Sequence, residues 1–295
     1  LETGSYGTVI GSYNHTEQFG DLSLSFGVNA ARSDGFSSAE ENNGNTEADS
    51  FRGNGQNFMI SYNLSPSMTV GLNGFRDASR AEFDEFVASP TDGTIGDETR
   101  QYRQTGLRAF SNWRGFTWDQ EFSITNVITD RSSQSVTVAP GGQTFASSFR
   151  GERTTAKYQA TTDRIQNLNL TLGGEFKEET AVSNSAPGSV TPITVQAAYS
   201  EGIWTPSSNL NITLALRFEE YSTFGDQTSS RIAVAYQASD QLTLRASYGT
   251  GFRAPSLSES VWTFASRGGT YRGNPTAMPE TSVSREVGAE YSFST

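Results

Sequence analysis

The strongest constraint on the fold is an alternation of apolar and polar residues that recurs along the chain. At 210–219 every even-numbered residue is Leu, Ile or Phe, and the odd-numbered residues are Asn, Thr, Ala, Arg and Glu. A period of two places these two sets on opposite faces of a β-strand. The same alternation recurs at 21–31, 58–64, 116–124 and 168–177. The sequence therefore predicts an antiparallel sheet with one apolar face.

The connections between these stretches alternate in length. Short connections are expected at 19–21, 65–68, 114–115, 163–167, 205–209 and 239–241. Long connections are expected at 34–50, 80–98, 130–148, 182–192 and 251–280, with a shorter one at 222–228. Short turns at one end and long polar loops at the other are typical of a transmembrane β-barrel. We expect about thirteen strands. A soluble β-sandwich or propeller is the alternative, although its strands are usually shorter and its connections alternate less regularly.

Composition fits the membrane barrel. Hydrophobic residues make up only 34% of the 295 residues, yet there are 19 Phe, 11 Tyr and 4 Trp. A thin apolar band, a polar lumen and aromatic girdles produce such a mixture. The girdle residues expected near the short connections are Trp113, Phe116, Trp118, Tyr199, Trp204 and Tyr236.

Charge and residue usage exclude several functions. The net charge of −11 argues against a nucleic-acid partner, which requires a basic surface. The chain has no cysteine and hence neither disulfides nor thiolate metal sites. His15, the only histidine, has no acid or nucleophile motif around it, so we expect a rim or lumen-facing residue and not a catalytic base.

Two linked motifs lie near the end of the chain. Tyr248–Glu259 reads YGTGFRAPSLSE, and Gly273–Glu280 reads GNPTAMPE. Together they resemble the mid-barrel signature of TonB-dependent outer-membrane receptors, in which a strand ends in the first motif and the second opens the next strand.

This resemblance implies a 22-stranded barrel around an N-terminal plug, working in the bacterial outer membrane. Members of the family import scarce nutrients and are not enzymes. Energy from the TonB complex of the inner membrane moves the plug. We expect residues 1–295 to be part of one barrel domain, roughly its second to fourteenth strand, with the plug and the C-terminal strands absent. A monomer in contact with lipid and lipopolysaccharide is expected, and a passive porin-like channel is the alternative.

The acidic loops bear on the ligand. SDGFSS (33–38), TEADSF (46–51), AEFDEFVASP (81–90) and GDETRQY (96–102) resemble the early barrel of cobalamin receptors within this family. The corresponding loops of those receptors bind calcium, which orders the ligand site. The resemblance assigns calcium to Glu47, Asp49, Asp84 and Asp97, with Glu98 as the alternative to Asp97. Calcium suits clustered carboxylates.

Alternatives to this assignment remain open. Ser37 stands where those receptors have an aspartate, and serine is a poor calcium ligand. The alternative is that the acidic side chains of these loops are solvated and bind no calcium. No organic cofactor is expected. Cobalamin is the expected ligand, and a ferric siderophore is the alternative because the motifs at 248–280 do not discriminate ligands.

Two further sets of residues are candidates for binding. Phe36, Phe86, Trp262 and Tyr271 lie in expected long loops and are candidates to grip an apolar or planar substrate. Arg253 is a candidate for contact with plug carboxylates or with substrate. Its alternative is a structural salt bridge between barrel wall and plug.

Overall fold

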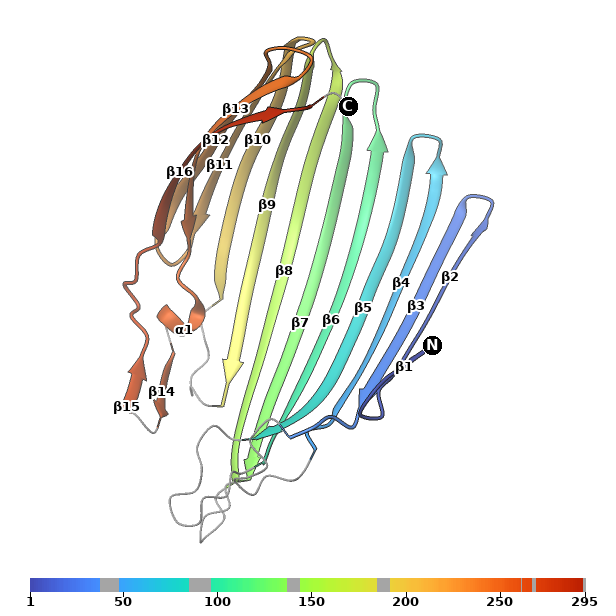
Figure 1. Ribbon diagram of the computed structural model, residues 1–295, viewed down its shortest axis with the longest axis vertical. Helices are drawn as coiled ribbons and strands as arrows, with labels where there is room; N and C mark the ends of the chain where they lie inside the picture. The colour runs from blue at the N-terminus through green and yellow to red at the C-terminus, as the bar shows by residue number, and fades with distance from the viewer. Residues whose placement is uncertain are drawn as a thin grey trace.

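The chain forms one large antiparallel sheet in the computed structural model, which describes residues 1–37, 48–84, 97–136, 144–184, 192–260, 262–266 and 269–293. Fourteen strands pair in the order β1 to β13 and then β16 (Figure 1). The strands are β1 (Glu2–Thr3), β2 (Val9–Phe19), β3 (Leu22–Ser33), β4 (Phe51–Ser65), β5 (Met68–Asp84), β6 (Asp97–Arg114), β7 (Asp119–Val136), β8 (Thr144–Ile165), β9 (Leu168–Ser183), β10 (Ile193–Ser207), β11 (Leu210–Tyr221), β12 (Gly225–Gln237), β13 (Leu242–Arg253) and β16 (Glu280–Tyr291). The all-β antiparallel fold and the strand number are thus confirmed.

Between β13 and β16 the chain builds a small excursion. It contains the one-turn helix α1 (Leu257–Ser260) and a separate hairpin of β14 (Thr263–Ser266) and β15 (Gly269–Arg272). The sequence predicted only a long loop here. No helix in the described residues is long and apolar enough to span a membrane.

The connections fall at two ends of the sheet, as predicted. Tight turns, such as the one between Phe19 and Leu22, lie at the top of Figure 1, and we call this the turn end. The C-terminal ends of β3, β5 and β7 lie at the opposite end of the sheet, which we call the loop end. Gly20 and Asn167 adopt positive φ angles of 59° and 60° in two of the turns. Glycine and asparagine tolerate this conformation best.

One predicted strand begins later than the pattern indicated. Phe116 and Trp118 continue the alternation of β7, but the Gly115 N–H donates to the Trp118 carbonyl over 2.9 Å and closes a turn. Phe116 is 98% exposed beside this turn. The expected connection at 114–115 therefore extends to Trp118, because a backbone hydrogen bond outweighs the alternation of side chains.

The register separates the two faces of the sheet. Leu22, Tyr62 and Val70 are cross-strand partners on β3, β4 and β5, so they share one face. We call this the apolar face. It also carries the leucines of β11, where Leu214 is 54% exposed. An exposed apolar band of this kind is expected where lipid covers it.

The opposite, polar face is linked across strands by charges. Arg217 Nη2 lies 3.2 Å from Glu175 Oε1 and 2.8 Å from Glu219 Oε1. Arg108 Nη2 lies 2.7 Å from Glu121 Oε1. The Arg108–Glu121 pair ties β6 to β7, and the Arg217–Glu175 pair reaches across β10 to link β11 with β9, on the face that would line a barrel lumen.

Tyr199 corrects the predicted aromatic girdle. It lies on the polar face, where its ring covers its cross-strand partner Gly173 and its hydroxyl donates to Gln159 over 3.1 Å. Trp113 and Tyr236 do lie on the apolar face beside the turns, opposite Met68 and Leu210. The number of residues between an aromatic side chain and the nearest turn indicates its height along the strand, but not which face of the sheet it lies on.

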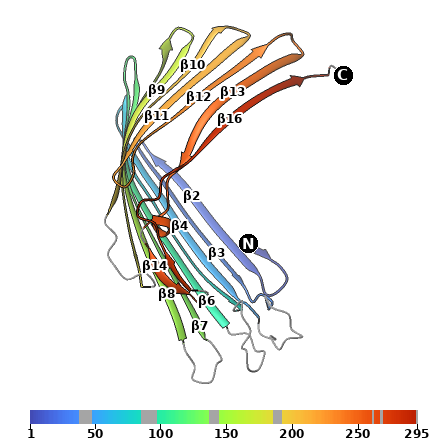
Figure 2. The same cartoon turned by 90° about the vertical axis from the view of Figure 1, so that its left-hand side faces the viewer.

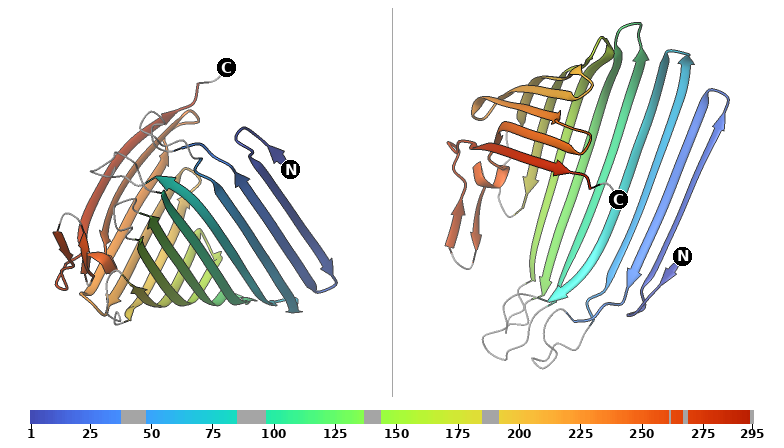
Figure 3. Two further views of the ribbon diagram at one scale, coloured as in Figure 1. Left: turned by 90° about the horizontal axis from the view of Figure 1, so that it is seen from below. Right: turned by 45° about the horizontal axis from the view of Figure 1, so that its top comes forward.

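The sheet is strongly curved and open. Figures 2 and 3 show the strands bending round from β2 to β16 without meeting. Among the described residues, β16 pairs only with β13, and β1 covers only two residues of β2. The described strands therefore form a curved section of barrel wall.

Candidate ligand-binding rim

The loop end gathers several of the residues assigned to calcium. Ser37 Oγ donates to Asp84 Oδ2 over 3.3 Å, which links the segment after β3 to the end of β5. The Asp49 N–H donates to the Phe36 carbonyl over 3.4 Å and brings the segment before β4 to the same place. Asp84 and Asp97 are direct cross-strand partners. Three separate segments thus converge at one part of the rim.

The calcium assignment is only partly visible in the structure. Glu47 lies outside the described residues, and only the backbone of Asp97 is described. In the part of the chain that the structure describes, no group of three or more His, Cys, Asp or Glu side chains is arranged to hold a metal. Calcium at this rim stays a prediction.

Close by, Glu82 shows how acids at this rim are held. Its carboxylate accepts from Ser50 Oγ over 2.6 Å and lies 3.1 Å from Arg80 Nη2. The Ser50 hydroxyl, followed by Arg80, lowers the pKa of Glu82. The Glu82 carboxylate is therefore already bound by Ser50 and Arg80 at the loop end of β5.

The candidate aromatic residues occupy different positions. Phe36 is 64% exposed and its ring centroid lies 5.3 Å from that of Tyr6. Tyr271 on β15 is 40% exposed. Phe86 lies outside the described residues. The substrate role of these three residues stays a prediction.

Trp262 is the candidate that contacts the wall of the sheet. Its ring meets Phe149 of β8 edge to face, with centroids 5.5 Å apart. Its indole N–H is buried and has no hydrogen-bond partner among the residues that the structure describes. A buried donor without an acceptor is costly.

Beside Trp262 lies a cluster that the sequence did not predict. Tyr102, Arg131 and Phe149 are successive cross-strand partners on β6, β7 and β8. The Arg131 guanidinium lies 5.7 Å from the Tyr102 ring centroid and 6.0 Å from that of Phe149. A guanidinium between two rings attracts planar anionic groups. Only the register of three strands, which the sequence does not specify, brings these residues together.

Arg253 is engaged within the chain. Its Nη1 donates to Glu259 Oε2 over 3.0 Å, and its Nη2 donates to Glu280 Oε1 over 2.7 Å. Its Nε also donates to Glu280, over 3.2 Å. The guanidinium thus joins the end of β13 to α1 and to the start of β16. Contact with a plug stays a prediction.

Glu259 also closes a capping box at α1. The Ser256 N–H donates to Glu259 Oε2 over 2.8 Å, and the Glu259 N–H donates to Ser256 Oγ over 3.2 Å. These two reciprocal hydrogen bonds satisfy two backbone N–H groups at the start of the helix. Hydrogen bonds from Arg253, and then from Ser256, lower the pKa of Glu259 to about 2.

His15 lies on the apolar face of β2. Its ring stacks parallel to Tyr13 with centroids 6.4 Å apart, and its Nε2 lies 3.8 Å from Glu17. His15 and Glu17 are opposite Phe26 and Leu24. This arrangement offers no nucleophile and supports no catalytic role for His15.

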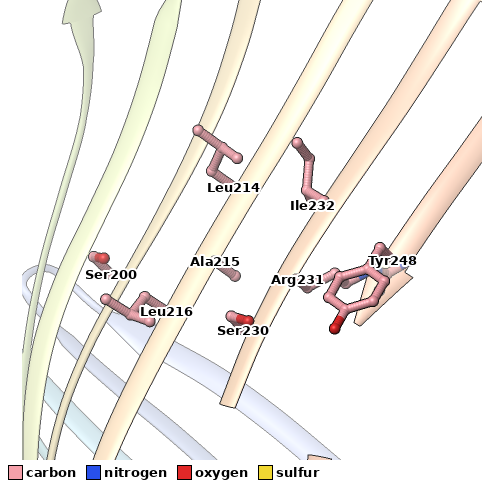
Figure 4. Close-up of a pocket in the computed structure, with 8 residues that line it drawn as sticks. All are labelled: Ser200, Leu214, Ala215, Leu216, Ser230, Arg231, Ile232 and Tyr248. Atoms are coloured by element: carbon pink, nitrogen blue, oxygen red, sulfur yellow. The ribbon is translucent and has the colours of Figure 1, made fainter. Parts of the chain in front are cut away.

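A hollow of about 280 Å³ lies over β10 to β13 (Figure 4). It is lined by Ser200, Leu214, Ala215, Leu216, Ser230, Arg231, Ile232 and Tyr248. Leu214, Ile232 and Tyr248 are successive partners on the apolar face. The hollow is therefore a groove in the exposed apolar band and not a site for a polar nutrient.

Comparison with known proteins agrees with the fold. A family model described as "TonB dependent receptor-like, beta-barrel" matches residues 2–295. An iron-regulated outer membrane virulence protein of Vibrio cholerae is 25% identical over 249 residues, which are 79% of this chain and 35% of the relative. The vitamin B12 transporter of Vibrio vulnificus is 32% identical over 127 residues, which are 41% of this chain and 19% of the relative.

A solved structure matches over nearly the whole chain. The siderophore receptor PirA from Pseudomonas aeruginosa superposes with a TM-score of 0.74 at 17% identity, covering 97% of this chain and 50% of the receptor. At this identity the likeness concerns the fold alone. The chain spans at most about half the length of these relatives.

Proposed function

Because the chain belongs to the TonB-dependent receptor-like β-barrel family of the outer membrane, we propose that it forms part of an active importer of a scarce nutrient. The described strands supply barrel wall, and the loop end captures the ligand. Energy delivered by the TonB complex to the plug then releases the ligand inward. Members of the family are transporters and receptors, and we propose no enzymatic step for this chain.

The proposed ligand is cobalamin, captured with the help of calcium. The convergence of Ser37, Asp49 and Asp84 at one rim carries this proposal. Asp84 and Asp97 are backbone partners in the register of β5 and β6, and carboxylates are ligands that calcium prefers. The similarity to the Vibrio vulnificus vitamin B12 transporter supports it as well.

A ferric siderophore is the second candidate. The iron-regulated Vibrio cholerae protein matches a larger share of the chain than the vitamin B12 transporter does. The Arg131 guanidinium between Tyr102 and Phe149 suits an anionic ligand with planar groups. Cobalamin does not require such a charge.

Equilibrium binding to the full-length receptor decides between the two. Cyanocobalamin and ferric enterobactin are titrated separately, each with calcium and with a chelator. The cobalamin proposal requires binding that weakens when calcium is removed or when Asp49 and Asp84 are both replaced by Ala. Arg131→Gln is the matched variant for the other candidate. It is expected to leave cyanocobalamin binding unchanged and to weaken binding of ferric enterobactin. Absence of cyanocobalamin binding, or binding indifferent to calcium and to the double replacement, refutes the cobalamin–calcium proposal.

A further inference from the structure

Three arginines form a row on the apolar face near the loop end. Arg32 of β3, Arg52 of β4 and Arg80 of β5 are direct cross-strand partners. All three side chains are exposed. Arg80 is paired with Glu82, whereas Arg32 and Arg52 make no ion pair within the described part of the chain. Like charges directly opposite one another destabilise a sheet unless an anion lies between them.

The height of this row along the strands is informative. The partners Leu22, Tyr62 and Val70 form an apolar row at the turn end of the same three strands. The arginine row lies ten residues further along each strand, since 32 − 22, 62 − 52 and 80 − 70 all equal ten. A tilted strand crosses a bilayer in about 9–11 residues. The arginine row therefore lies where the apolar band ends and lipid headgroups begin.

Towards the turn end the face beside this row is basic, whereas Glu82 and Asp84 of β5 share the face on the loop-end side. Arg76 of β5 and Arg103 of β6 lie on the same face, two to four residues nearer the turn end. Between the two rows, β3, β4, β5 and the adjoining part of β6 carry no acid on this face, within residues that are all described. The whole chain has a net charge of −11, so this group of arginines is a basic patch on an otherwise acidic protein.

The other half of the sheet has the opposite charge at the same distance from the turns. Glu178 lies ten residues after Leu168 on β9, and Glu220 lies ten residues after Leu210 on β11. Both glutamates are exposed on the apolar face. The anion that the arginines attract is therefore expected at β3 to β6 and not around the whole wall.

We propose that the arginine row binds the phosphate groups of a phosphorylated glycolipid in the outer leaflet of the outer membrane. Guanidinium groups bind phosphate through paired hydrogen bonds. Neighbouring strands lie about 4.8 Å apart, so adjacent arginines are close enough to share one phosphate. The bound headgroup relieves the repulsion within the row and fixes the height of the barrel in the membrane. This row is distinct from the Arg131 cluster on the polar face, and Asp84 of the proposed calcium site lies four residues beyond Arg80 on β5.

The test measures lipid retained by the intact receptor. The full-length receptor is purified in detergent, titrated with bis-phosphorylated lipid A, and the bound lipid is counted by native mass spectrometry. Each arginine is expected to contribute about fivefold in affinity, so Arg32→Gln with Arg52→Gln weakens binding roughly 25-fold. The matched control is Arg131→Gln, which removes the same charge from the polar face of β7, two strands away from β5, and leaves lipid binding unchanged.

Several outcomes would overturn the proposal. These are unaltered lipid binding in the double variant, an equal loss in Arg131→Gln, equal binding of dephosphorylated lipid A, and displacement of the lipid by inorganic phosphate at similar concentration. The last result would indicate a site for free anions. If the double variant does not fold, Arg52→Gln alone is used, with an expected loss of about fivefold. Since nutrient binding is not measured, failure here leaves the proposed import function untouched.

Discussion

The guanidinium of Arg253 donates to both carboxylate oxygens of Glu259, with Nη1 to Oε2 and Nη2 to Oε1 each at 3.0 Å. The same guanidinium binds Glu280 at the start of β16. One side chain thus fixes both ends of the excursion that carries α1, β14 and β15. This gives the YGTGFRAPSLSE and GNPTAMPE motifs a shared structural role, because each supplies a carboxylate to Arg253.

Replacing Arg253 by Lys should loosen this excursion. Lysine keeps the charge but loses the fork that holds two carboxylates at once. Because the ion pairs are solvent-exposed, the expected effect is modest, with amide exchange over residues 257–273 faster by about twofold to fivefold. Hydrogen exchange of the full-length receptor measures this. Arg245→Lys is the control, since Arg245 pairs with Glu290 at the turn end. Equal exchange in the wild type and Arg253→Lys contradicts the assigned role.

The contact between Arg253 and Glu259 should survive mild acid. The pKa of Glu259 is lowered from 4.5 to about 2, so the carboxylate is favoured in the folded state. A lowered pKa means that the stabilisation is complete above about pH 4.5 and is lost as pH falls through about 2. Carbon NMR of the Glu259 carboxyl group in micelles should show a midpoint near pH 2. A midpoint between pH 4 and 5 in the wild type would show that the contact does not form.

Gly173 should not tolerate a side chain. A Cβ there would overlap the Tyr199 ring, whereas a Cβ on neighbouring Gly174 meets nothing closer than the Ala197 carbonyl at 3.6 Å. Overpacking of this kind costs about 1–3 kcal/mol. Gly173→Ala should therefore lower the stability to denaturant of the folded receptor in detergent, and Gly174→Ala should leave it nearly unchanged. Similar stability in both variants would be inconsistent with the register of β9 and β10.

The assignment of faces can be tested on β11. Leu214 lies on the apolar face, near the middle of the strand, and Thr213 lies on the polar face. An arginine facing lipid at the bilayer midplane costs about 2–4 kcal/mol, whereas an arginine facing the lumen costs much less. Leu214→Arg should reduce folding yield and stability in lipid vesicles, and Thr213→Arg should not. The reverse order would mean that the two faces are exchanged.

The sequence predicts the wall of this fold better than its edges and sites. Alternation at 210–219 specifies both the strand and its lipid-facing side, since lipid demands an apolar residue at every second position. It fails at Phe116, where a backbone hydrogen bond forms a turn although the alternation continues. It also misses α1, whose capping box at Ser256 and Glu259 was present in the sequence but belongs to a helix of one turn.

The sites depend on strand register, which the alternation does not fix. Arg131 meets Phe149, and Arg32 meets Arg52, only because strands separated by long connections align at those residues. Asp49 and Asp84 were identified by resemblance to cobalamin receptors. The structure adds that their segments converge through Ser37 and Phe36.

Energised uptake tests the proposed function most directly. The full-length receptor is expressed in cells that lack their own cobalamin receptor, and accumulation of radiolabelled cyanocobalamin is measured with and without a functional TonB complex. We predict accumulation that requires both the receptor and the TonB complex. Equal accumulation without TonB would indicate a passive channel and would contradict active import. No accumulation in either case, despite correct insertion in the outer membrane, would refute cobalamin as the ligand.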